Sequence, residues 1–179
     1  MKQGFIRKGI FLTLAAMLMT SLAWAQQDKA GRPSPPQTAT GKVDGATITI
    51  NYASPSVKGR KIFGDLVPFD KVWRAGANEA TIFETDKAIK IDGKSLPAGK
   101  YSLYAQPGES EWTFFFNSEV GQWGIKRTGE TTKDASKDVL SVKAKPVKSA
   151  SLTEKLAYEV TPKGFVLRWE NVEVPVMIK

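Results

Sequence analysis

The stretch ATITINYA, residues 46–53, places Ile48 and Ile50 at alternate positions between threonine and asparagine. Successive side chains of a β-strand point to opposite faces of a sheet, so this alternation predicts a strand with one buried face. Runs of similar character follow at residues 80–85, 88–92, 100–105, 111–117, 139–144, 155–161, 165–170 and 172–178. Turn residues such as Asp92-Gly93 lie between them. The pattern predicts an all-β protein, a single-domain antiparallel β-sandwich of jelly-roll-like form, and leaves the strand order open.

The first residues of the chain predict a signal peptide. Lys2, Arg7 and Lys8 precede an uncharged apolar stretch at residues 10–22, and the sequence AWA at 23–25 supplies the small residues that a signal peptidase reads. A membrane-spanning helix needs about 20 apolar residues, more than this stretch provides. We therefore expect cleavage after Ala25, no membrane span in the mature chain, and a periplasmic or secreted location.

Beyond the predicted signal peptide, the character of the chain changes near residue 40. Residues 26–40 are polar and contain Pro33, Pro35 and Pro36, which predicts an extended lead-in. The strand pattern occupies residues 41–179, a length that suits one β-sandwich domain.

The composition excludes several kinds of chemistry. The sequence has no cysteine and no histidine, so it forms no disulfide and lacks the Ser-His-Asp arrangement and the commonest zinc ligands. We predict no metal, no cofactor and no catalytic residue, and any catalysis would need carboxylates, lysine, tyrosine or arginine. The net charge is +8, with three of the positive charges in the predicted signal peptide. Because the lysines are spread along the chain, we expect no nucleic-acid partner.

Residues 54–79, SPSVKGRKIFGDLVPFDKVWRAGANE, interrupt the strand pattern. Compact domains rarely contain such long irregular connections without a purpose, so this segment is the candidate site. Arg60 and Lys61 follow Gly59, where a turn in the backbone would direct cations at one anion. The alternative is a tight turn whose charges are simply solvated.

Arg74, Asn78 and Glu79 lie around a glycine later in the same segment. They would either line a cleft and contact a ligand, or pin the segment to the sheet through an ion pair between Arg74 and Glu79. Trp123, between glycines in GQWG, would either stack on a sugar ring or cover an edge of the sheet. The polar residues 127–138 predict an exposed, mobile loop.

Several motifs in the chain resemble those of one family. They are RPSPP at 32–36, PSVKGRKIFGDLVP at 55–68, VWRAGANEAT at 72–81, LPAGKYSL at 96–103, WTFFFN at 112–117 and QWG at 122–124. Together they resemble the family called domain of unknown function 2911, over essentially residues 32–179. The resemblance implies an exported bacterial protein of the Bacteroidetes type with one domain, and implies no particular activity.

Three functions are compatible with these observations. The first is a periplasmic, non-enzymatic binding or accessory domain for an anionic or sugar-like ligand, which the absence of histidine and cysteine favours over catalysis. The second is a structural or interaction domain in which residues 54–79 only cover one end of the sandwich. The third is a carboxylate-dependent hydrolase of envelope glycans, although no spacing singles out a pair among Asp65, Asp70, Glu79, Glu84, Glu109 and Glu111.

Overall fold

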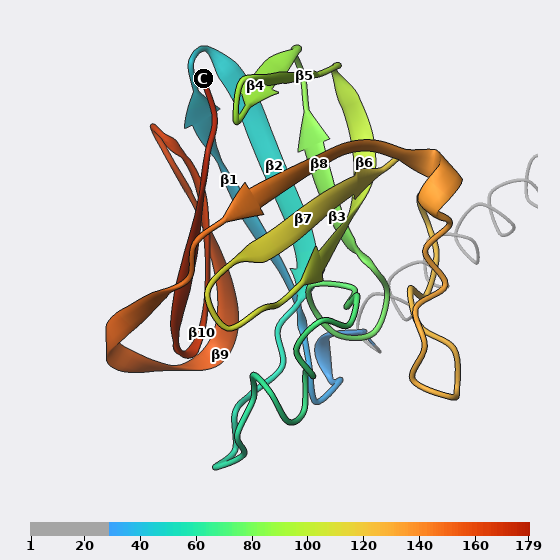
Figure 1. Ribbon diagram of the computed structural model, residues 1–179, viewed down its shortest axis with the longest axis vertical. Helices are drawn as coiled ribbons and strands as arrows, with labels where there is room; N and C mark the ends of the chain where they lie inside the picture. The colour runs from blue at the N-terminus through green and yellow to red at the C-terminus, as the bar shows by residue number, and fades with distance from the viewer. Residues whose placement is uncertain (1–28) are drawn as a thin grey trace, which may run out of the picture. The chain divides into compact units, whose positions relative to one another are not determined.

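The computed structural model describes residues 29–179, and the predicted signal peptide, residues 1–25, lies outside them. Contacts divide the chain into two compact units, Met1–Pro35 and Pro36–Lys179. Within the described part of the first unit, the backbone N–H of Arg32 donates to the carbonyl of Lys29 at 3.3 Å. The second unit contains all the strands of the described residues (Figure 1).

The second unit is an antiparallel β-sandwich. Six strands form one sheet in the order β1-β2-β3-β6-β7-β8, with bounds β1 (Pro36–Val43), β2 (Ala46–Ala53), β3 (Thr81–Thr85), β6 (Gly99–Gln106), β7 (Trp112–Asn117) and β8 (Asp138–Ala144). β4 (Ile89–Ile91) pairs with β5 (Lys94–Leu96), and β9 (Val147–Thr161) pairs with β10 (Gly164–Met177). A short 3₁₀ helix, η1 (Ala135–Lys137), precedes β8. The predicted all-β fold with one long irregular segment is confirmed.

The strand order of the large sheet follows the chain, apart from the inserted β4–β5 hairpin. Its connections are therefore those of a meander, which are simpler than the Greek-key connections of a jelly roll. Tight turns enforce this order: Asp44 and Gly45, between β1 and β2, have φ values of 47° and 76°. Two successive positive φ values are typical of the hairpin turns whose twist matches the flanking strands.

Large side chains from both layers meet in the core. Phe114 and Phe116 of β7 are fully buried, and their neighbour Phe115 points to the opposite face, as the period of two requires. Phe116 contacts Phe83 of β3 with ring centres 5.0 Å apart, and Phe114 contacts Phe165 of β10 with ring centres 5.7 Å apart. The two-stranded β9–β10 sheet thus covers the apolar face of the large sheet.

β10 combines two predicted strands, 165–170 and 172–178, into one. The register with β9 shifts on both sides of Glu170, which has a φ of 57°. A bulge of this kind bends a strand and redirects a side chain. Here the carboxylate of Glu170 accepts a hydrogen bond from the backbone N–H of Ile62 at 3.4 Å, so the bulge connects β10 to the irregular segment.

Gly164, at the start of β10, allows a close approach of two backbones. A Cβ at this position would lie 2.0 Å from the carbonyl oxygen of Val176, whereas a Cβ at Gly93, in the β4–β5 turn, would meet nothing within 4 Å. We predict that Gly164→Ala lowers the free energy of unfolding by about 3 kcal/mol, and that Gly93→Ala lowers it by about 1 kcal/mol because only its positive φ opposes a side chain. Urea unfolding measures both, and equal losses would contradict the close approach.

Candidate functional site

Residues 54–79 are held in a fixed shape at both ends. At the start, the backbone N–H of Val57 donates to the carbonyl of Glu154 at 2.8 Å, and the N–H of Leu156 donates to the carbonyl of Pro55 at 2.9 Å. At the other end, Trp73 and Ala105 exchange two backbone hydrogen bonds of 2.7 and 2.8 Å. These are ladder-type bonds to β9 and β6, so a segment without strand patterning is nevertheless fastened to both layers.

An aromatic cluster anchors the middle of this segment. The ring of Trp73 stacks on that of Trp169 from β10, with centres 5.9 Å apart and an interplanar angle of 19°. Phe63 contacts both Trp169 and Trp112 edge-on, at 6.0 and 4.9 Å. The indole N–H of Trp73 donates to the carbonyl of Gly76 at 2.9 Å, which also holds the following turn. Trp73 therefore anchors the segment in the core.

A second irregular stretch, residues 118–134, connects β7 to η1; we call it the strap (Figure 1). Tyr104, which points outward from β6, donates its hydroxyl to the side-chain oxygen of Gln122 at 3.2 Å. The hydroxyl of Ser102 donates to the carbonyl of Glu119 at 2.7 Å, and the N–H of Ala80 donates to the carbonyl of Gln122 at 3.0 Å. The strap is thus attached both to β6 and to the end of the irregular segment.

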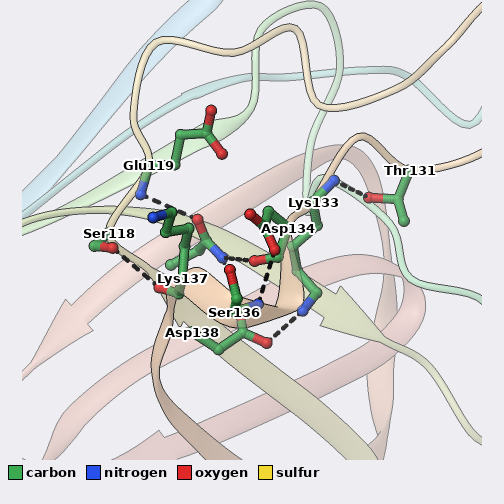
Figure 2. Close-up of polar contacts among 9 residues, drawn as sticks. Ser118, Glu119, Thr131, Lys133, Asp134, Ser136, Lys137 and Asp138 are labelled. Atoms are coloured by element: carbon green, nitrogen blue, oxygen red, sulfur yellow. Dashed lines mark hydrogen bonds and ion pairs between the residues drawn. The ribbon is translucent and has the colours of Figure 1, made fainter.

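The base of the strap contains a largely buried ion pair (Figure 2). The ammonium group of Lys133 pairs with the carboxylate of Asp138, and their side chains are only 6% and 17% exposed. The same ammonium lies 4.5 Å from the ring centre of Phe115. Asn117 donates to Asp138 at 2.7 Å and to the carbonyl of Asp134 at 2.8 Å. The prediction of an exposed, mobile loop at 127–138 is wrong for Lys133, because tertiary partners bury a side chain that reads as solvated in sequence.

A groove of about 760 Å³ lies between the irregular segment and the strap. Its lining comprises residues 66–68 and 70–74 on one side and residues 124–126 and 128–131 on the other. The apolar part includes Leu66, Pro68 and Ile125. The charged part comprises Asp70, Lys71, Arg74, Lys126 and Glu130. Glu130 pairs with Lys126 at 3.4 Å, so the remaining lining has an excess of positive charge.

Arg74 connects the two walls of the groove. Its guanidinium donates to the carbonyl of Trp123 at 3.3 Å and lies 5.5 Å from the centre of the Trp123 ring. Partial burial lowers the pKa of Arg74 by desolvation, and the charge of Glu79 acts in the opposite direction. Gly124 packs closely against Arg74. A Cβ added at Gly124 would lie only 2.9 Å from the Cβ of Arg74.

The structure brings together part of the predicted site. Arg74 lines the groove, and Trp123 lies beside it with 52% of its surface exposed. Glu79 acts electrostatically on Arg74, and Asn78 adopts a φ of 57° in the turn between them. Arg60 does not line the groove, because its guanidinium donates to the carbonyls of Val57 and Ser56, at 3.0 and 2.6 Å, in its own turn.

Lys61 is exposed and also lies outside the groove lining. Sequence reasoning missed Lys71, Lys126 and the other lining residues of the strap. Apart from the QWG motif at 122–124, the strap carries no strand or motif signal of its own. Its position depends on contacts with residues that are distant in sequence, such as Arg74 and Trp123, which are 49 positions apart. No local pattern reveals such a contact.

Two simple patterns are relevant to the described part of the chain, a cluster of metal ligands and a membrane-spanning helix. Within residues 29–179, no three acidic, histidine or cysteine side chains gather to hold a metal ion. No helix in this range is long and apolar enough to cross a bilayer. The carboxylates that line the groove are Asp70 and Glu130, one from each side.

The fold and the groove define a class: an antiparallel β-sandwich domain whose long irregular segment and strap enclose a groove with a cationic rim. The chain belongs to the family described as protein of unknown function DUF2911, which it matches over residues 34–178. The match includes all the strands of the described residues and the two walls of the groove. Searches of curated proteins and of solved structures found no match.

The contact between Arg74 and Trp123 gives a direct prediction. Arg74→Met keeps the apolar stem but removes a hydrogen bond and a cation–π contact, so we expect a loss of about 1–2 kcal/mol in the free energy of unfolding. The matched change Arg127→Met, at an exposed arginine of the strap, should change it by less than about 0.5 kcal/mol. Urea unfolding followed by far-UV circular dichroism compares them, and indistinguishable curves would show that Arg74 does not tie the walls together.

Proposed function

We propose that this protein is an exported, periplasmic or secreted, non-enzymatic binding or accessory domain that holds a small anionic ligand in the groove. The observation that carries the proposal is the position of Arg74, a partly buried arginine in the wall of a groove that also contains Lys71. The third cation of the lining, Lys126, is paired with Glu130. The proposed export rests on the predicted signal peptide, with cleavage after Ala25.

The electrostatics of the lining favour an anion. Desolvation of Arg74 makes its charge costly, and a carboxylate or phosphate in the groove would lower that cost by a charge-assisted hydrogen bond. Lys71 is exposed on the same wall and adds a long-range attraction. Because Glu130 is paired with Lys126, it opposes an incoming anion less than an unpaired carboxylate would.

The shape of the lining favours an anion with an apolar body over a carbohydrate. Leu66, Pro68 and Ile125 offer surface for an apolar chain or ring. Sugar binding by stacking needs an aromatic face that is open to the ligand. Trp73 stacks on Trp169, and Trp123 has the guanidinium of Arg74 close to its ring and is not part of the groove lining.

A structural or interaction role is the second candidate. It is supported by the many bonds that fasten residues 54–79 to β6 and β9, since those bonds would be needed whether or not a ligand binds. Hydrolysis of envelope glycans has less support, because it needs two carboxyl groups about 5 to 10 Å apart across the bond to be cleaved. Glu130, one of the two groove carboxylates, is already in an ion pair.

Calorimetric titration with octanoate tests the binding proposal, with octan-1-ol and N-acetylglucosamine as neutral probes. We expect octanoate to bind more tightly than either neutral probe. Lys71→Met should weaken octanoate binding about 3-fold and Arg74→Met about 10-fold or more, because the first removes an exposed charge and the second a charge-assisted hydrogen bond. Lys61→Met removes the same charge from the same segment outside the groove and should leave the affinity within about 2-fold.

The outcomes separate the candidate functions. Preference for N-acetylglucosamine would favour the carbohydrate-like ligand over the anion. If a thermal-shift screen of carboxylates, phosphates and envelope sugars found no ligand at all, the binding proposal would be wrong and the structural role would be favoured. Equal effects of Lys71→Met and Lys61→Met would show that the groove is not where octanoate binds.

A further inference from the structure

The groove-lining part of the strap is a small rigid unit. Ile125 and Thr131 form an isolated antiparallel bridge, and the N–H of Lys126 donates to the carbonyl of Glu130 at 2.7 Å. The N–H of Gly129 donates to the carbonyl of Lys126 at 3.1 Å, which closes the turn. Residues 125–131 therefore form a miniature hairpin, and so few bonds would not keep it folded in water once its two ends were released. Its orientation is set by whatever holds its two ends.

Both ends of this hairpin are fixed to the rest of the domain. At residues 123–124, Trp123 and Gly124 pack against Arg74, as described above. At the other end, Lys133 inserts between the carboxylate of Asp138 and the ring of Phe115. The backbone N–H of Lys133 donates to the hydroxyl of Thr131 at 3.1 Å, which links Lys133 to the end of the hairpin (Figure 2). Lys133 is thus rigidly coupled to the hairpin on one side and to the sheet on the other.

The partners of Lys133 belong to the scaffold. Phe115 and Asn117 lie on β7, and Asp138 is the first residue of β8. Asn117 fixes the Asp138 carboxylate by donating to its other oxygen at 2.7 Å. A largely buried ammonium group is held firmly beside its carboxylate, because separating the ion pair would leave both charges desolvated and unpaired. The pair therefore fixes the strap relative to β7 and β8 at one place.

We propose that Lys133 is the positioning residue for the strap wall of the groove: through Asp138 and Phe115, it sets where residues 125–131 lie. The consequence for ligand binding rests on the proposed function, but the positioning of the wall does not. A merely structural role would give a different result, because loss of the pair would then loosen β7 and β8 as much as the strap.

The experiment compares Lys133→Met with Lys137→Met, which removes an exposed lysine four residues later. Trypsin cleavage after Lys126 and Arg127 measures opening of the strap, and Lys133→Met removes its own cleavage site. We expect cleavage at these two positions to be about 10-fold faster in Lys133→Met, because proteolysis follows the population of the open form. Lys137→Met should be cleaved at the wild-type rate.

Hydrogen exchange and octanoate affinity complete the test. The amides of residues 125–131 should lose protection in Lys133→Met, while those of Leu103 and Phe116 in the sheet keep it. Octanoate affinity should fall about 10-fold, as for Arg74→Met. If Lys133→Met does not fold, Asp138→Asn, which keeps the hydrogen-bonding shape and removes the charge, should show the same changes at a smaller size.

The results distinguish the two proposals. The positioning role of Lys133 would be overturned if Lys133→Met and Asp138→Asn were both cleaved and exchanged at the wild-type rates. Equal loss of protection in the strap and in β7 would also overturn it. Faster opening of the strap together with no octanoate binding to the wild-type protein would leave the positioning role in place and count against the proposed function.

Discussion

The stacking of Trp73 on Trp169 is the contact on which the arrangement of the site depends. Trp169 belongs to β10 in the small sheet, and Trp73 belongs to the irregular segment, with Phe63 joining both to Trp112 of the large sheet. Each such side chain removes roughly 150–250 Å² from water, so the cluster supplies much of the free energy that orders a segment without secondary structure. The bonds of that segment to β6 and β9 act together with the cluster to hold the segment in place.

The groove follows from two irregular stretches that are distant in sequence. One wall is held by the aromatic cluster, and the other, the strap, lies on the outer face of the large sheet. Arg74 and Trp123 join them, and this contact explains why a cation is kept partly out of water: its guanidinium has a carbonyl and an aromatic ring to receive it. The same placement leaves a positively charged rim next to apolar surface, which is the physical basis of the proposal that the groove holds an anionic ligand with an apolar part.

The two faces of the large sheet are stabilised by different interactions. On the inner face, Phe83, Phe114 and Phe165 pack without polar partners. On the outer face the strap buries Tyr104, Lys133 and Asp138, and each of these has a hydrogen-bond or charge partner. Burial of polar groups is costly unless they are paired, so the outer face tolerates few alternative arrangements of the strap. This constraint on the strap agrees with the proposal that Lys133 sets the position of the strap wall of the groove.

The sequence determined the scaffold by itself, because strand alternation and turn chemistry are local. Residues 46–53 form β2 with the predicted bounds, and Asp92-Gly93 makes the turn between β4 and β5 with two positive φ values. β1 was missed because Pro36 and its polar neighbours carry little strand signal, and an edge strand needs none beyond its pairing with β2. Of the candidate site, Trp73 and Arg74 were identified within residues 54–79, whereas Lys71, Lys126 and Lys133 read as solvated lysines. Only the tertiary structure decided their roles, because whether a lysine meets water, a groove or a buried carboxylate depends on which distant residues the fold brings to it.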